Sequence, residues 1–202
     1  FEKGGKFEKL GSTFGAFETF AFVPNEVTKK GSHIRDAVDM KRTIIVVVLA
    51  LIPALLFGMW NVGYQHSLSI GETAPICDTI WSNFWYGFLR VLPIIIVTYV
   101  VGLAIEFMYA QIRGHAVNEG FLATGLLIPL IVPVTIPLWQ VALATAFAVV
   151  IGKEVFGGTG MNFMNPALIA RAFLFFAYPS CMSGDKVWIN EAGDAISGAT
   201  PL

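Results

Sequence analysis

The chain has 202 residues, of which 55% are hydrophobic and 13% charged; its formal net charge is −1 and its mean hydropathy +0.69. A composition this apolar is typical of a membrane protein that crosses the bilayer several times. The near-neutral charge and the lack of a basic stretch interleaved with aromatic residues exclude a nucleic acid as the expected partner. We therefore expect an all-α, polytopic membrane helix bundle with short segments broken by Pro and Gly. Because the chain does not begin with Met and stops just after Thr200, we also expect it to be part of a longer protein.

Residues 1–42 are polar and mixed, and their basic side chains gather directly before the first hydrophobic stretch. The loop that follows that stretch, at 65–85, contains Glu72 and Asp78 but no Lys or Arg. By the positive-inside rule, residues 1–42 form a cytoplasmic N-terminal segment. Its phenylalanines favour an interfacial amphipathic anchor, with an approach to quinone at this interface as the weaker alternative.

Two long hydrophobic stretches predict the first two membrane helices. Residues 43–64 contain no charge and are long enough for one crossing, with Pro53 expected to kink the helix. The second helix is predicted at 88–109, preceded by an interfacial belt of aromatic residues, Trp81, Trp85 and Tyr86.

Residues 120–152 form an uncharged run too long for one simple crossing. As a single helix they would extend about 50 Å, against a hydrocarbon core of about 30 Å. Prolines at four-residue intervals in the middle of the run predict a break into two segments, 121–135 and 137–152; these prolines are Pro129, Pro133 and Pro137. The two segments are either short crossings or a re-entrant hairpin. Two crossings here would give about five in the bundle at 43–179 and leave residues 180–202 outside the cytoplasm.

Lys153 and Glu154 follow this run and lead into a glycine-rich segment at 156–166. Asn165 is expected to cap a last helix that begins at Pro166 and runs to Pro179. Two interpretations of the glycine-rich segment remain equally open. It is either a tight cytoplasmic turn or irregular backbone whose carbonyls coordinate a small cation.

The most informative motif lies near the end of the chain, Asp194-Ala195-Ile196-Ser197-Gly198-Ala199-Thr200. It resembles the acceptor motif on which a flavin transferase esterifies the phosphate of FMN. In that interpretation Thr200 supplies the acceptor hydroxyl, Gly198 and Ala199 leave room for the modifying enzyme, Ser197 shapes the loop and Asp194 helps to bind the metal-assisted transferase. The alternative is an unmodified polar turn.

Two ionisable residues lie within the apolar stretches. Arg171 must face a partner, because an unpaired guanidinium is costly there; the partner is either a carboxylate or the phosphate or ring carbonyl of a flavin. Glu106 is either a membrane-edge residue that reaches water near Arg113, the favoured interpretation, or a sodium or proton ligand. His115 and Glu119 fall short of a metal site, and Cys77 and Cys181 are expected to be unpaired thiols.

Several runs carry a family resemblance, from the basic N-terminal segment to the end of the chain. They are His115–Gly120, Ile131–Pro133, Pro137–Gln140, Lys153–Gly160, Asn165–Leu168, Arg171–Pro179 and the terminal Ser-Gly-Ala-Thr. Together they resemble the B subunits of the sodium-translocating NADH:quinone oxidoreductases. The runner-up is the family of D subunits of the Rnf-type ferredoxin:NAD oxidoreductases, and a small-solute channel or transporter is the competing class.

The resemblance implies a subunit of a multi-subunit enzyme complex in the bacterial inner membrane that oxidises NADH, reduces ubiquinone and exports sodium. It implies FMN bound covalently to Thr200 on the periplasmic side, so that residues 180–202 are the flavin-attachment segment. It also implies riboflavin in the intact subunit and a second, related bundle of helices, of which this chain would be one half.

Overall fold

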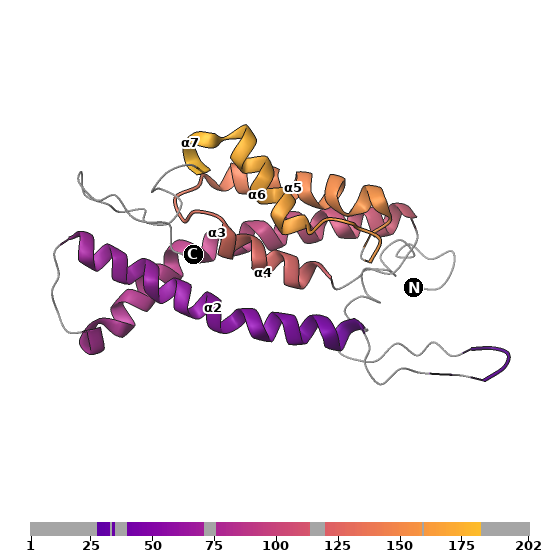
Figure 1. Ribbon diagram of the computed structural model, residues 1–202, viewed down its shortest axis with the longest axis horizontal. Coiled ribbons are helices and arrows are strands. Elements are labelled where there is room, and N and C mark those ends of the chain that lie inside the picture. The colour runs from indigo at the N-terminus through magenta and orange to yellow at the C-terminus, as the bar shows by residue number, and fades with distance from the viewer. Residues whose placement is uncertain are drawn as a thin grey trace, which may run out of the picture.

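The computed structural model describes residues 28–32, 34, 40–70, 76–113, 120–158 and 160–182. All regular secondary structure in these residues is helical (Figure 1), with the following elements: α2 (Met40–Ser69), α3 (Ile76–Arg113), α4 (Phe121–Ile131), α5 (Leu138–Gly152), the 3₁₀ turn η2 (Glu154–Phe156), α6 (Pro166–Ala177) and α7 (Pro179–Met182). The predicted all-α membrane bundle is confirmed.

Three of the described helical segments are long and apolar enough to cross a membrane: Thr43–Ser69, Thr79–Arg113 and Leu138–Phe156. The helices α4 and α6 are apolar but shorter. The chain is therefore a multi-pass membrane protein, and its first predicted span, 43–64, is confirmed within α2.

The helix α3 is longer than predicted. It begins at Ile76, twelve positions before the predicted 88, and includes Trp81, Trp85 and Tyr86, which were expected to precede the helix. The extra turns pack against α2, where the Ser67 hydroxyl donates a hydrogen bond to Asn83 Oδ1 at 2.6 Å. Such packing stabilises helical turns that local sequence does not mark. At 38 residues α3 extends about 57 Å, so part of it must tilt or lie outside the hydrocarbon.

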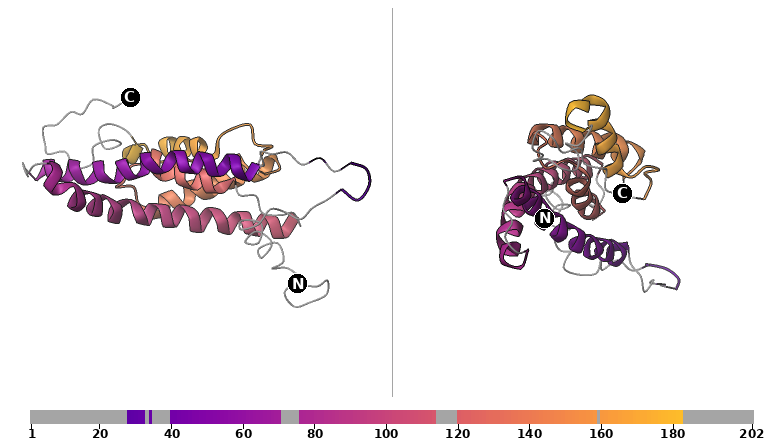
Figure 2. Two further views of the ribbon diagram at one scale, coloured as in Figure 1. Left: turned by 90° about the horizontal axis from the view of Figure 1, so that it is seen from below. Right: turned by 60° about the vertical axis from the view of Figure 1, so that its left-hand side comes forward.

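The helices α2 and α3 are antiparallel and cross near the loop that joins them (Figure 1). Two glycines permit the close approach: a Cβ on Gly63 would collide with the backbone of Asn83, and one on Gly87 with the backbone of Met59. The left view in Figure 2 shows α2 and α3 meeting near the loop that joins them and separating toward the other end of the bundle. No hydrophobic effect drives helices together within the membrane, so they associate by close van der Waals packing, which small residues at the crossing permit.

Replacing Gly63 by Val should therefore force α2 and α3 apart. We expect a loss of at least about 2 kcal/mol of stability, since overpacking against rigid backbone cannot be relieved by a rotamer change. Gly58→Val is the matched control, because a Cβ at Gly58 on the same helix meets nothing within 4 Å. Thermal unfolding of the two variants in detergent measures the difference, and equal melting temperatures would contradict this account of the crossing.

The predicted break in the long apolar run is confirmed. The helix α4 ends at Ile131 and α5 begins at Leu138, so Pro133 and Pro137 lie in the break, whereas Pro129 is inside α4. The start of α6 is also as predicted: Pro166 is its first residue and the Asn165 side chain accepts a hydrogen bond from Ala167 N at 2.9 Å. The helix ends at Ala177, two residues short of the predicted end, because the residue before Pro179 disfavours helical geometry.

The core between α5 and α6 is built largely from small residues. Ala144 and Ala148 of α5 and Ala167 and Ala170 of α6 have no exposed surface. The ends of α3 and α5 and the starts of α2, α4 and α6 lie at the same end of the bundle, on the right in Figure 1. This arrangement brings the end of α5 beside the last turns of α3.

Candidate functional site

The predicted flavin-attachment residues, Asp194, Ser197, Gly198, Ala199 and Thr200, lie outside the described residues. So do His115 and Glu119, and of Cys77 only the backbone is described. The attachment site therefore stays a prediction, and the geometry of the described residues concerns the membrane bundle alone.

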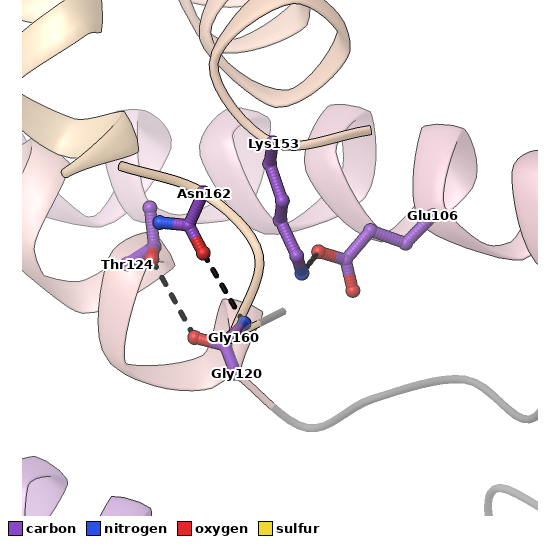
Figure 3. A network of polar contacts seen from close by, with 6 residues as sticks. All are labelled: Glu106, Gly120, Thr124, Lys153, Gly160 and Asn162. Atoms are coloured by element: carbon purple, nitrogen blue, oxygen red, sulfur yellow. Dashed lines mark hydrogen bonds and ion pairs between the residues drawn. The ribbon is translucent and has the colours of Figure 1, made fainter. Parts of the chain in front are cut away.

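A buried ion pair joins α3 to the end of α5. Lys153 Nζ donates a hydrogen bond to Glu106 Oε1, and the two residues, which lie 47 positions apart in sequence, are each 4% exposed (Figure 3). Figure 3 shows the two side chains extending toward each other, Glu106 from α3 and Lys153 from the turn directly after α5. Each charge compensates the other, which offsets part of the large cost of taking both out of water.

This pair differs from the favoured expectation for Glu106, which was a side chain that reaches water near Arg113. Arg113 is exposed at the end of α3, where its guanidinium lies over the Tyr109 ring at 5.6 Å from the centroid. Glu106 instead faces the bundle interior, because α5 supplies a basic partner there. The role of Glu106 as a sodium ligand stays a prediction.

Glu154 adds a second buried carboxylate beside this pair. It opens the 3₁₀ turn η2, is 3% exposed, and its Oε2 has no hydrogen-bond partner. Glu154 directly follows Lys153, the partner of Glu106, in the chain. Lys153 and Glu154 had no predicted role, although two adjacent opposite charges at the end of a long uncharged run were a signal for a buried site.

The glycine-rich segment closes on itself as a turn between η2 and α6. Gly157 has a φ of 114°, a left-handed conformation that favours glycine, and its N–H donates to the Glu154 carbonyl at 3.2 Å. The Asn162 side chain accepts a hydrogen bond from Gly160 N at 3.3 Å (Figure 3). It also donates one to the Met164 carbonyl at 2.9 Å. Several polar groups of the segment are thus satisfied within the turn, and coordination of a cation by its carbonyls stays a prediction.

Arg171 lies in the middle of α6 and is partly buried. Its predicted contact with a flavin or a carboxylate stays a prediction. In the part of the chain that the structure describes, no three His, Cys, Asp or Glu side chains converge in a way that could hold a metal ion.

Comparison with known proteins places these residues in a family context. The model of the NQR2, RnfD, RnfE family matches residues 27–202. The B subunit of the Na(+)-translocating NADH-quinone reductase of Stutzerimonas stutzeri is 50% identical to the chain, which is covered completely and corresponds to 54% of that relative. The B subunits of Ectopseudomonas mendocina and Chromohalobacter salexigens are 49% and 48% identical, again over the whole chain and over 54% and 53% of their own lengths. The chain thus spans about half the length of the curated relatives it matches.

Proposed function

The chain belongs to the NQR2, RnfD, RnfE family, and on that premise we propose that it works as part of the B subunit of a sodium-translocating NADH:quinone reductase. The observation that carries the proposal is 50% identity along the entire chain to a relative that bears this name. Because the family model also includes Rnf-type proteins, the names of these relatives favour the quinone reductase over the Rnf-type alternative.

In this proposal Thr200 holds FMN as a phosphodiester and does no redox chemistry itself. The flavin ring carries the electron, while the protein anchors and orients it. A flavin transferase attaches the FMN to Thr200, and Ser197, Gly198, Ala199 and Asp194 form the attachment loop. The match to the family model, at residues 27–202, and the alignment to the Stutzerimonas stutzeri relative both include this loop.

The proposed complex oxidises NADH, passes electrons toward ubiquinone and exports sodium across the bacterial inner membrane. The N-terminal segment is cytoplasmic and Thr200 periplasmic, as the positive-inside rule favours. Riboflavin and the other subunits complete the intact enzyme. Glu106 is a sodium ligand and Arg171 contacts the flavin or a carboxylate; both are partly or fully enclosed on helices of the described bundle, where an ionisable side chain marks a functional position.

In-gel flavin fluorescence of the denatured protein tests the proposal. Co-expression with the flavin transferase should give a fluorescent band, because a phosphodiester survives denaturation, and Thr200→Val should abolish it by removing the acceptor hydroxyl. Ser197→Ala is the matched control: it removes a neighbouring hydroxyl and should leave the band. A wild-type band that never fluoresces would overturn the covalent flavin and favour a solute transporter, which the broken α4–α5 segment would also suit.

A further inference from the structure

A small aromatic group lies at the end of the bundle opposite the Glu106–Lys153 pair, where α5 begins and α6 ends (Figure 1). The rings of Trp139 and Tyr178 meet edge to face with their centroids 5.3 Å apart, and the Tyr178 ring also contacts Phe173 at 6.4 Å. An edge-to-face contact covers at most one face of the indole, and Trp139 is 58% exposed. The indole therefore has room to stack with a planar ligand.

The next residue, Gln140, is buried with its side-chain carbonyl oxygen unsatisfied. It is 7% exposed, and none of the described residues donates a hydrogen bond to its Oε1. Gln140 is the third residue of α5, where a glutamine commonly accepts a hydrogen bond from the N–H of the capping residue, but here that residue is Pro137, which has no N–H. A buried acceptor without a donor is costly, so a ligand that brings an N–H to Gln140 would stabilise the start of α5.

The predicted flavin anchor continues the chain from this same end of the bundle. Tyr178 directly follows the last turn of α6, and the short helix α7 ends at Met182. The residues between Met182 and Thr200 can extend up to about 60 Å, whereas the whole of α5 is about 22 Å long. A group attached to Thr200 can therefore reach the start of α5 without crossing the bundle.

The chemistry of these side chains suits the ring system of a flavin. The ring is planar with largely apolar faces, so an indole can stack against it. Its pyrimidine edge carries one N–H donor between two carbonyl oxygens, and the carboxamide of a glutamine offers the complementary acceptor and donors. A flavin thus supplies both a face for Trp139 and the donor that Gln140 Oε1 lacks.

We propose that Trp139 and Gln140 bind the ring of the flavin that Thr200 carries. The ring stacks against the Trp139 indole, and its pyrimidine N–H donates a hydrogen bond to Gln140 Oε1. Tyr178 contacts the indole and Phe173 contacts Tyr178, which restricts the movement of the indole. The inference rests on the proposed covalent FMN and adds the residues that position its ring: Thr200 fixes the phosphate, and the start of α5 fixes the orientation of the ring.

Flavin fluorescence of the folded, oxidised complex tests the stacking contact. A stacked indole quenches flavin emission, so Trp139→Leu should raise the emission of this flavin several-fold; its emission is measured as the difference from the same complex carrying Thr200→Val. Trp81→Leu is the matched control, because Trp81 is 81% exposed near the start of α3, at the same end of the bundle, and meets Phe84 edge to face. It should leave the emission unchanged. Equal emission in Trp139→Leu and the wild type would overturn the stacking.

Thermal unfolding of the intact complex tests the hydrogen bond to Gln140. With the flavin attached, Gln140→Leu should lower the unfolding temperature, because it removes a buried hydrogen bond. In the Thr200→Val background the same replacement should raise this temperature, since an unsatisfied acceptor gives way to an apolar side chain of similar size. A purely structural role for Gln140 predicts the same shift with and without the flavin, and that result would exclude the hydrogen bond.

In-gel fluorescence of the denatured protein separates the ring site from the covalent attachment. Trp139→Leu and Gln140→Leu should both keep the fluorescent band, because neither side chain takes part in the bond to Thr200. A wild type without the band would overturn the covalent flavin and the ring site with it. A wild type with the band, in which neither replacement changes the emission or the unfolding temperature as expected, would overturn the ring site alone.

Discussion

Replacing Lys153 by Met should destabilise the bundle by about 3–5 kcal/mol, the usual cost of removing one partner from a buried ion pair. Met has nearly the volume of Lys, so the loss reports charge and hydrogen bonding and not a cavity. The variant leaves Glu106 and Glu154 buried together without a counter-ion. Thermal unfolding of the intact complex in choline buffer, where no small cation can replace the ammonium, measures the effect.

The rescue comes from the buried group of Glu106, Lys153 and Glu154, and the control from outside it. Arg113→Met removes an exposed cation from α3 and should cost less than about 0.5 kcal/mol, as surface substitutions do. In Lys153→Met the three positions carry a net charge of −2, and adding Glu106→Gln returns it to the wild-type value of −1. The double variant should therefore recover a large part of the lost stability. An equal loss in the single and double variants would show that Lys153 acts through packing and not as a counter-ion.

Features of the fold that depend on neighbours in sequence were predictable. The proline spacing gave the break between α4 and α5, because each ring removes a helical hydrogen bond wherever the helix lies. The start of α6 could be predicted from Asn165 and Pro166. The Asn165 side chain accepts a hydrogen bond from a backbone N–H of the first turn, and Pro166 has no N–H that would need a partner.

Features that depend on which helices pack against each other could not be predicted from the sequence. Contacts with α2, such as that of Ser67 with Asn83, stabilise the extra turns of α3. No pattern within residues 76–87 predicts these contacts. The partner of Glu106 was equally hidden: Lys153 lies 47 positions away, and only the packing of α5 against α3 brings the two together. Arg113 is much nearer in sequence, and for that reason it was the expected neighbour.

The three buried charged residues precede α6 in sequence, and the predicted flavin anchor Thr200 follows it. The proposed enzyme must couple sodium binding to electron transfer, and these two functions are thus assigned to different segments. Glu106 lies on α3 and Lys153 and Glu154 directly follow α5, whereas Thr200 lies beyond α7 in sequence and outside the described residues. If Glu106 is the proposed sodium ligand and Thr200 the proposed flavin anchor, the two functions are built from different segments and can be disabled independently. Glu106→Gln should then alter sodium binding without removing the flavin.

Replacing Thr200 by Val should, conversely, stop electron transfer through this part of the complex while the bundle remains intact. If FMN on Thr200 is an obligate carrier, quinone reduction by the intact complex should fall by at least about 100-fold, equivalent to about 2.7 kcal/mol in activation free energy. NADH oxidation with an artificial acceptor that takes electrons before they reach Thr200 should persist. Steady-state rates with the two acceptors, compared in one preparation, measure the split.

Thr200→Ser provides the graded control for that experiment. Serine retains an acceptor hydroxyl, so covalent flavin and quinone reduction should return together and in proportion. The same variants also test whether sodium binding depends on the flavin. Sodium binding measured without NADH should be equal in Thr200→Val and the wild type. Full quinone reduction in a Thr200→Val complex without covalent flavin would mean that electrons bypass Thr200, and the assignment of this residue as the anchor of an obligate carrier would then be wrong.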